Sequence, residues 1–233
     1  MIKVNRQATL NIEYIGQDKT PILIIDNYAD NHNELVDQVI AHAQFIPDEV
    51  TNYPGIRSAI PKALVVGYLK PLIEVLYRVY KLPDLLQPNP IDNYLSLITK
   101  QPNELSAMQS WPHFDTPNPN LIAIIHYMNK GTHGGTAFFK HNKSGLDRIN
   151  NDNKETYLKF AQAYFQSSTL RELNYCNEQH NEFTCYKTVA YKPNRLIVFP
   201  GQLLHSTLVN AATDINSDPI TGRLTANLFL SFK

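Results

Sequence analysis

The stretch Arg195-Leu196-Ile197-Val198-Phe199-Pro200-Gly201-Gln202-Leu203-Leu204-His205 contains the pattern that decides the fold. Its first half is an apolar β-strand, the Pro-Gly pair turns the chain, and His205 begins the next strand. Other short strands are predicted on both sides of it, separated by residues typical of turns, at 94–99, 121–128, 136–140, 184–191 and 223–232. Many short strands with turns between them indicate two antiparallel sheets packed as a jelly roll.

The N-terminal third has a different pattern, because helices and strands alternate there. Residues 22–25 form a short apolar strand, and apolar stripes of helical period predict helices over 31–43 and 69–82. The segment 53–57 is rich in turn residues, so no regular element is expected in it.

These patterns together predict a single domain that is mainly β with flanking helices. An N-terminal α/β segment over 1–92 would support a β core over 93–233. The core would be interrupted by an insertion at about 141–187, which contains a helix over 154–166.

Composition excludes several classes of partner. The 21 Lys and Arg residues balance the 21 Asp and Glu residues, so neither a nucleic acid nor an anionic membrane surface is expected.

Residues 1–6 are followed by no apolar stretch and do not resemble a signal peptide. Two cysteines, Cys176 and Cys185, are too few for a disulfide scaffold, and we expect reduced thiols in a cytoplasmic protein.

His113 and Asp115 are the first candidate metal ligands. If the chain is extended here, residues two apart point to the same face and can contact one ion. Two histidines and one carboxylate on one face of an octahedron leave positions open for a bidentate cosubstrate and dioxygen, as in non-haem iron(II) oxygenases. His205, which follows the Pro-Gly turn, is the candidate third ligand.

A histidine two residues before an acid is a weak signal by itself, because chance alone gives about one such pair in this composition. Two rival pairs exist. His32/Glu34 begins a predicted helix, where such residues diverge, and His180/Glu182 lies in a polar stretch expected to be a solvated loop. Only His113/Asp115 is followed by strands that can bring a second histidine back to it.

Arg223 and Thr225 share one face of the last predicted strand. An arginine offers a planar pair of donors to a carboxylate, and a nearby hydroxyl can add a hydrogen bond. They are therefore candidates to bind the far end of a dicarboxylic cosubstrate.

At this point the chain resembles the prolyl-4-hydroxylase-like branch of the Fe(II)/2-oxoglutarate oxygenase superfamily. Four stretches in the expected order support this, namely His113-Phe114-Asp115, Ile125-His126-Tyr127-Met128-Asn129, Gly134-Gly135-Thr136-Ala137-Phe138, and Phe199-Pro200-Gly201 leading to His205. The resemblance implies a double-stranded β-helix with Fe(II) and 2-oxoglutarate as cofactor and cosubstrate. It also implies a dioxygenase that uses dioxygen to hydroxylate an amino acid, peptide side chain or small metabolite, releasing succinate and CO₂.

The chain departs from this branch in one respect. Many relatives use a lysine about ten residues after the second histidine to bind 2-oxoglutarate, whereas the first cation after His205 is Arg223. We therefore assign the cosubstrate carboxylate to Arg223 and Thr225, a solution common elsewhere in the superfamily. The insertion at 141–187 is expected to shape the substrate entrance.

Four further residues are candidates near the site. Gln109, on the expected strand face of His113, is a candidate for cosubstrate binding or a solvated amide. Trp111 would line the substrate pocket or pack in the core. Tyr53 and Arg57 belong to a Tyr-Pro-Gly-x-Arg turn with little packing purpose, so the arginine is a candidate for a substrate carboxylate.

Two other functions fit the same residues. A cupin-like metalloenzyme that never uses 2-oxoglutarate can share the metal ligands, and binding of 2-oxoglutarate separates the two. A non-catalytic binding module on an oxygenase fold is the other alternative.

Overall fold

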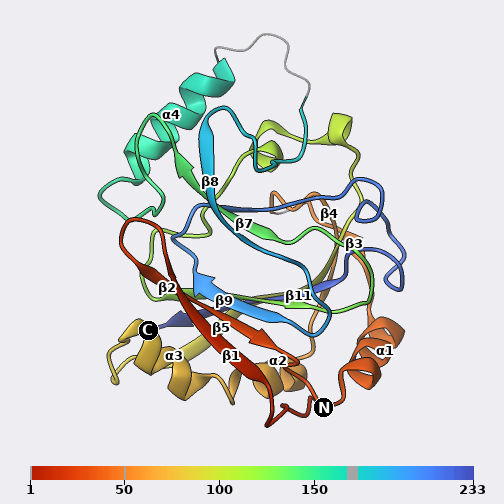
Figure 1. Ribbon diagram of the computed structural model, residues 1–233. Coiled ribbons are helices and arrows are strands. Elements are labelled where there is room, and N and C mark those ends of the chain that lie inside the picture. The colour runs from red at the N-terminus through yellow and green to blue at the C-terminus, as the bar shows by residue number, and fades with distance from the viewer. Residues whose placement is uncertain (1, 50, 167–172) are drawn as a thin grey trace.

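Two antiparallel sheets form the centre of the computed structural model, which describes residues 2–49, 51–166 and 173–233 (Figure 1). The strands of the larger sheet are β1 (Thr9–Ile15), β2 (Thr20–Asp26), β3 (Ile46–Pro47), β4 (Gly55–Ala59), β5 (Pro88–Ile98), β6 (Leu121–Tyr127), β9 (Leu196–Pro200) and β11 (Thr225–Phe232). They are ordered β1-β2-β9-β6-β11-β5-β4-β3. The smaller sheet comprises β7 (Thr136–His141), β8 (Phe183–Val189) and β10 (His205–Thr207), in the order β10-β7-β8. The mainly β, double-sheet fold predicted from the sequence is confirmed.

The two faces of the larger sheet bury different cores. In β6, Ile122 and Ile124 pack in an outer core beneath α1 (His32–His42), α2 (Lys62–Leu69) and α3 (Ile73–Tyr80). Ala123 and Tyr127 point the other way and pack against Phe138 of β7, between the two sheets. This alternation follows from the two-residue period of a strand.

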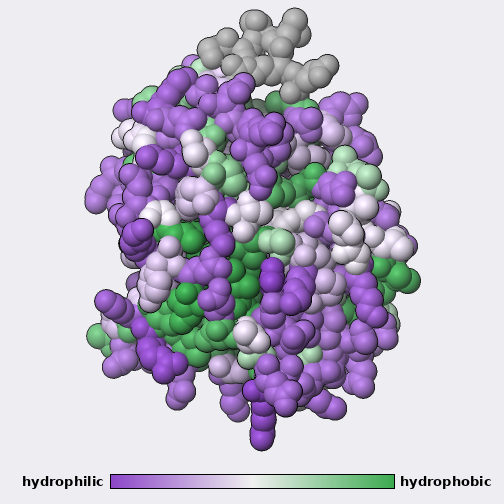
Figure 2. All heavy atoms as spheres, in the orientation of Figure 1, coloured by the Kyte–Doolittle hydropathy of each residue, from purple (hydrophilic) through white to green (hydrophobic). Residues whose placement is uncertain are grey.

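The fourth helix, α4 (Lys154–Gln166), covers the outer side of the smaller sheet, where Tyr157 and Ala161 pack with Phe139. The layers are therefore three helices, the large sheet, the small sheet and α4 (Figure 1). Polar side chains dominate the face seen in Figure 2, while apolar side chains gather in the region of β2 and β9. Within the described ranges, no helix combines the length and apolar character needed to cross a lipid bilayer. Residues 167–172 of the expected insertion lie outside the described residues.

Three expectations for the N-terminal third were wrong. The helix expected over 69–82 is interrupted, because Pro71 lacks an N–H and clashes with a continuing helix; α2 ends at Leu69 and α3 begins at Ile73. The segment expected to be a turn contains β4, which pairs with β5. Strand β1 was not predicted, although it forms a seven-residue ladder with β2.

Two further boundaries differ from expectation around the core. Strand β5 begins at Pro88, so the expected start of the core at residue 93 lies inside it. The segment before His113 is not a strand, because a 3₁₀-helix spans Ala107–Ser110. Gln109 lies in that helix, where its side chain caps the helix start by accepting from the Ser106 N–H, so it does not share a strand face with His113.

Asp26 at the end of β2 forms ion pairs with the segment that precedes β9. Arg195 binds both its carboxylate oxygens, at 2.6 and 3.0 Å, and Lys192 adds a contact of 2.8 Å. The hydrogen bonds from Arg195 are the main cause of a pKa lowered to about 2. A depressed pKa stabilises the folded protein above the unfolded value near 3.8, and this stabilisation is lost as pH falls towards 2.

We expect Asp26→Asn to lower the free energy of unfolding by about 1 kcal/mol or less at pH 7, since solvent screens this partly exposed group. The difference from the unmodified protein should shrink between pH 4 and pH 2, as measured by chemical denaturation. Asp84→Asn, in an exposed turn, is the control. A constant difference across this pH range would show that the ion pairs do not contribute.

Candidate functional site

His113 and His205 are fixed to each other through their backbones. The His113 N–H donates to the His205 carbonyl at 2.9 Å, and the His205 N–H donates to the His113 carbonyl at 2.8 Å. Such a reciprocal antiparallel pair sets the two Cα atoms about 5.5 Å apart. The imidazole ring centroids are consequently 4.3 Å apart, although the residues are far apart in sequence.

Asp115 is brought to the same point by the turn that follows β9. Its N–H donates to the Gly201 carbonyl at 2.7 Å. A Cβ atom on Gly201 would lie 2.6 Å from a methyl carbon of Leu121 and 3.1 Å from Asp115 Oδ2, so glycine suits this close approach. Asp115 Oδ1 lies 3.9 Å from His113 Nε2 and 3.8 Å from His205 Nε2. The three ligand atoms lie within 4.8 Å of one another, a spacing that one metal ion can bridge.

The tautomer of His205 suits metal binding. Its Nδ1 lies 2.8 Å from the Leu203 carbonyl, which can only accept a hydrogen bond. Nδ1 therefore holds the proton and Nε2 keeps a lone pair directed towards Asp115. Phe199 packs against the His205 ring with centroids 4.8 Å apart, so one side of the site is apolar.

The charges of the site are poorly satisfied by the protein itself. Desolvation and the neighbouring His205 lower the pKa of His113 well below its usual value, although 51% of its side chain is exposed. Burial also raises the pKa of Asp115, against the opposing effect of His205 and Arg57. Asp115 Oδ2 is buried and accepts no hydrogen bond. A carboxylate oxygen without a donor, beside two imidazole nitrogens, is the chemistry of a divalent cation site.

A cavity of about 410 Å³ opens beside His113 and Asp115. Tyr53, Arg57 and Gln109 line it, as does the apolar side chain of Phe229. This volume lies at the lower end of the range for ligand pockets, roughly 300–1,000 Å³. The structure thus brings Tyr53, Arg57 and Gln109 to the cavity that adjoins the three candidate ligands.

Trp111 lies elsewhere. It is 3% exposed and packs in the core beneath α4, where its Nε1 donates to the Tyr157 hydroxyl at 2.9 Å. Tyr157 in turn donates to the Pro112 carbonyl, so this core supports the backbone that precedes His113. Trp111 is a packing residue and not part of the cavity wall.

Arg223 lies just before β11 and is 2% exposed. Its Nε donates to the Gly134 carbonyl at 2.7 Å, and its guanidinium faces the rings of Tyr127 and Tyr191 at 5.6 and 5.8 Å. Within the described residues it forms no ion pair, and Nη2 is buried without a hydrogen-bond partner. A buried cation without a carboxylate partner is unfavourable unless a ligand supplies one.

Thr225 and Tyr53 lie close to this cation. Thr225 pairs with Ser96 of β5 and Tyr127 of β6, so the three side chains form one row on the inner face. The buried Tyr53 hydroxyl lies near Ser96 and Arg223; burial raises the pKa of Tyr53, and the charge of Arg223 opposes this. Among the described residues the Tyr53 hydroxyl makes no hydrogen bond of good geometry, although Ser96 lies close enough to lower its pKa. Two buried donors, Tyr53 Oη and Arg223 Nη2, therefore lack acceptors in one region.

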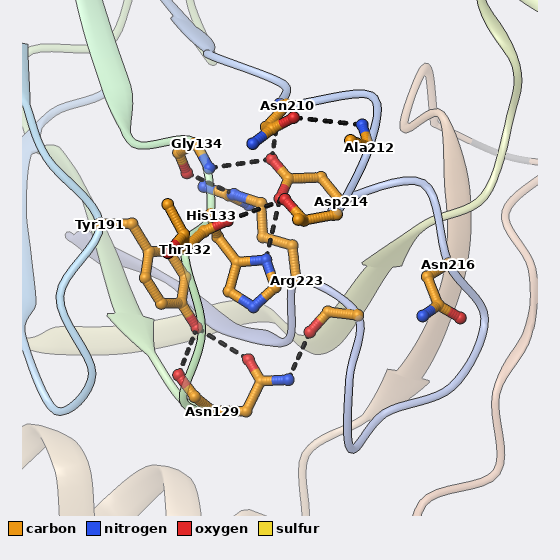
Figure 3. Close-up of polar contacts among 12 residues, drawn as sticks. Asn129, Thr132, His133, Gly134, Tyr191, Asn210, Ala212, Asp214, Asn216 and Arg223 are labelled. Atoms are coloured by element: carbon orange, nitrogen blue, oxygen red, sulfur yellow. Dashed lines mark hydrogen bonds and ion pairs between the residues drawn. The ribbon is translucent and has the colours of Figure 1, made fainter.

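Sequence patterns did not indicate Asp214, which holds the loop before Arg223 in place (Figure 3). Asp214 is fully buried and accepts from His133 Nδ1 at 2.9 Å, from the Gly134 N–H at 2.9 Å and from the Asn210 N–H at 2.8 Å. Burial alone would raise its pKa, but these hydrogen bonds outweigh burial and lower it. The carboxylate thus ties the loop to the same Gly134 whose carbonyl receives Arg223.

Comparison with known proteins agrees with this architecture. The family model described as "Family of unknown function (DUF6445)" matches residues 6–230. HygX from Streptomyces hygroscopicus, solved with nickel, 2-oxoglutarate and hygromycin B, superposes with a TM-score of 0.53 at 10% identity, covering 92% of this chain and 83% of HygX. The non-haem α-ketoglutarate-dependent epimerase SnoN from nogalamycin biosynthesis superposes with a TM-score of 0.51 at 10% identity, covering 91% of this chain and 78% of SnoN. No curated protein matches the sequence. At this identity the likeness establishes the fold alone, which this chain shares with HygX and SnoN.

Asp214→Ala should lower the free energy of unfolding by about 2–4 kcal/mol, because several buried donors lose their acceptor together. Chemical denaturation measures this effect. Asp218→Ala changes an exposed aspartate in the same loop and should have little effect. Equal losses in the two variants would contradict a specific role for Asp214.

Proposed function

This chain belongs to the family of unknown function DUF6445, and we propose that it is a non-haem iron dioxygenase that uses 2-oxoglutarate to oxidise a small molecule. The observation that supports this best is the arrangement of His113, Asp115 and His205. Their ligand atoms converge within 4.8 Å, and Asp115 Oδ2 has no partner in the protein. Two imidazoles and one carboxylate leave half of an octahedron open for other ligands.

The residues present fit ferrous iron. His113 and His205 would offer Nε2, and Asp115 would offer one carboxylate oxygen. When bound, the iron with 2-oxoglutarate and dioxygen supplies the oxidising power for C–H hydroxylation, with succinate and CO₂ as coproducts. The presence of Asp115 favours hydroxylation over halogenation, which requires that position to be vacant for halide.

Arg223 fits the far carboxylate of 2-oxoglutarate. Its unpaired Nη2 and the unpaired Tyr53 hydroxyl would both gain an acceptor from one carboxylate, and Thr225 could add a third donor. Charge-assisted hydrogen bonds of this kind are roughly twice as strong as neutral ones. In this assignment Tyr53 contacts the cosubstrate rather than the substrate, and Gln109 is a wall of the cavity.

The protein's own residues would act by binding, orienting and excluding water. The Leu203 carbonyl holds the proton on His205 Nδ1, so Nε2 stays available to the metal. Asp214 and Gly134 hold Arg223 at a fixed place, and Phe199 keeps water from one side of His205. Such preorganisation is the contribution that proteins make when a metal performs the difficult step.

Several finer assignments are part of this proposal. The four motifs that include Gly134-Gly135 and Phe199-Pro200-Gly201 support membership of the prolyl-4-hydroxylase-like branch. A small-molecule substrate is supported by the modest cavity and by HygX, which was solved with hygromycin B. A reducing, cytoplasmic location is supported by two cysteines that form no disulfide, and it would suit ferrous iron.

Three alternatives remain distinguishable. A cupin-like metalloenzyme would bind iron but not 2-oxoglutarate, and a non-catalytic module would bind both without producing succinate. SnoN shares the fold and is an epimerase, so the product must also be examined. Incorporation of an oxygen atom from dioxygen indicates hydroxylation, whereas inversion of a stereocentre without it indicates epimerisation.

We expect His113→Ala, Asp115→Ala and His205→Ala each to weaken Fe(II) binding by more than about 100-fold, since even outer-shell changes at metal sites cost about 10–100-fold. Anaerobic titration measures this. The rival histidines are tested as His32→Ala and His180→Ala, which should bind iron like the starting protein. Loss of iron in the His180 variant with retention in the His113 variant would overturn the assignment.

Arg223→Gln should weaken 2-oxoglutarate binding by about 2–5 kcal/mol and leave Fe(II) affinity nearly unchanged. Tyr53→Phe removes one neutral donor and should weaken binding by about 1 kcal/mol. Both affinities can be measured anaerobically by calorimetry or by the absorbance of the iron complex. Arg78→Gln, in α3 on the far side of the large sheet, is the control. An unchanged affinity of the Arg223 variant for 2-oxoglutarate would show that another residue binds its far carboxylate.

A further inference from the structure

Arg57 is a second cation on the inner face of the large sheet. It lies in β4 and pairs in register with Ser96 of β5, which pairs with Thr225 of β11. Its neighbour Ile56 packs against the outer core, so Arg57 points to the other side, where it lines the same cavity as His113 and Asp115. Arg57 in β4 and Arg223, just before β11, therefore both face the space between the two sheets.

The guanidinium of Arg57 is held firmly by its neighbours. Its Nη1 lies 3.0 Å from Asp48 Oδ2 and donates to Thr51 Oγ1 at 3.1 Å. Its carbon Cζ lies 4.2 Å from the ring centroid of Tyr53 and 5.2 Å from that of Tyr94. The side chain of Asp48 is only 6% exposed, so this ion pair is shielded from water. These contacts fix the plane of the guanidinium before any ligand arrives.

The ion-pair contact with Asp48 and the hydrogen bond to Thr51 both involve Nη1, whereas Nε is buried without a hydrogen-bond partner among the described residues. The edge formed by Nε and Nη2 has two parallel N–H donors, the geometry that binds a carboxylate in bidentate fashion. A buried donor without an acceptor is unfavourable and is normally paired by a ligand or water. The arrangement is that of an anion subsite, and the aromatic side chains of Tyr53 and Tyr94 orient it.

We propose that Arg57 binds a carboxylate of the primary substrate, so that the substrate class is a small carboxylate with an apolar body. The inference rests on the proposed function, in which 2-oxoglutarate occupies Arg223. The rest of the wall supports the apolar body, because it is formed mainly by large nonpolar side chains, namely Ile98, Met108, Phe114, Leu121, Val209 and Phe229. The cavity volume of about 410 Å³ limits the size of the substrate.

Tyr53 lies between the two arginines, so a ligand bound to Arg57 and a ligand bound to Arg223 would occupy different positions. Its ring packs against the guanidinium of Arg57, while its hydroxyl lies near Arg223 and Ser96. A carboxylate on Arg223 would contact the hydroxyl, whereas one on Arg57 would contact the donors on the other side of the ring. Arg57 lines the same cavity as His113 and Asp115. A substrate held by its carboxylate at Arg57 would therefore place its body in the cavity that adjoins the candidate metal site.

The test compares carboxylates with their neutral amides. The probes are 3-phenylpropanoate, hexanoate and indole-3-acetate, each with its primary amide, added to protein loaded with redox-inert Zn(II) and saturating 2-oxoglutarate. Ligand-observed NMR gives the dissociation constants. In the starting protein at least one carboxylate should bind about tenfold or more tightly than its amide. This preference should vanish in Arg57→Gln and persist in the control Arg78→Gln.

Arg57→Lys keeps the charge and the pairing with Asp48 but loses the planar edge, so it should retain the fold and lose most of the preference. Thermal unfolding of both Arg57 variants checks that they are folded. Affinity for 2-oxoglutarate is measured in the same variants and should not change. The inference is wrong if no carboxylate is preferred, if the preference survives in folded Arg57→Lys, or if Arg57→Lys loses 2-oxoglutarate. Failure of the starting protein to bind 2-oxoglutarate would instead refute the proposed function.

Discussion

The reciprocal backbone pairing of His113 with His205 is the constraint on which the site depends. The two residues exchange both of their hydrogen bonds, at 2.9 and 2.8 Å, although neither lies in a long strand. Two further contacts complete the candidate metal centre. The turn after β9 places Gly201 against Asp115, and the Leu203 carbonyl sets the tautomer of His205. The single bridge between His113 and the start of β10 thus brings the two histidines together, although the segment around His113 is not a strand.

The inner face of the large sheet changes character from one side to the other. On β2 and β9 it presents Ile24, Ile197 and Phe199, which pack against the small sheet. On β11, β5 and β4 it presents Thr225, Ser96 and Arg57, and of these three Arg57 lines the cavity. The outer face stays apolar throughout because the helices cover it. The two-residue period of a strand thus directs apolar side chains towards the small sheet on β2 and β9, and polar side chains to the same side on β11, β5 and β4.

Local sequence was sufficient for features that depend on local patterns. The apolar run before Phe199-Pro200-Gly201 predicted β9, and the spacing of His113 and Asp115 identified candidates that the fold brings together with His205. Local sequence was insufficient where partners are distant. Asp214 lies 81 residues from His133, and no pattern near either residue indicated their contact.

The misjudged segments have equally physical causes. The apolar stripe over 69–82 has a helical period, but Pro71 cannot continue a helix, and the chain therefore forms α2 and α3 on either side of it. Gly55 begins β4 rather than a turn, because pairing with β5 outweighs the local preference of a Pro-Gly sequence. Trp111 could not be assigned from sequence, since a lone tryptophan near a ligand suits a core as well as a pocket.

The two arginines of the inner face differ in how their charge is balanced, and this difference assigns them different tasks. Arg57 is paired with Asp48, so the protein tolerates it whether or not a ligand is bound. Arg223 is more deeply buried and has no carboxylate in contact among the described residues, and Asp214 acts on it only at longer range. An uncompensated buried cation makes the ligand-free state costly, and a ligand that removes this cost stabilises the folded protein by mass action. In the proposed function, 2-oxoglutarate at Arg223 would therefore couple cosubstrate binding to the stability of the fold. A substrate that leaves Arg57 would leave behind an arginine that is still paired with Asp48.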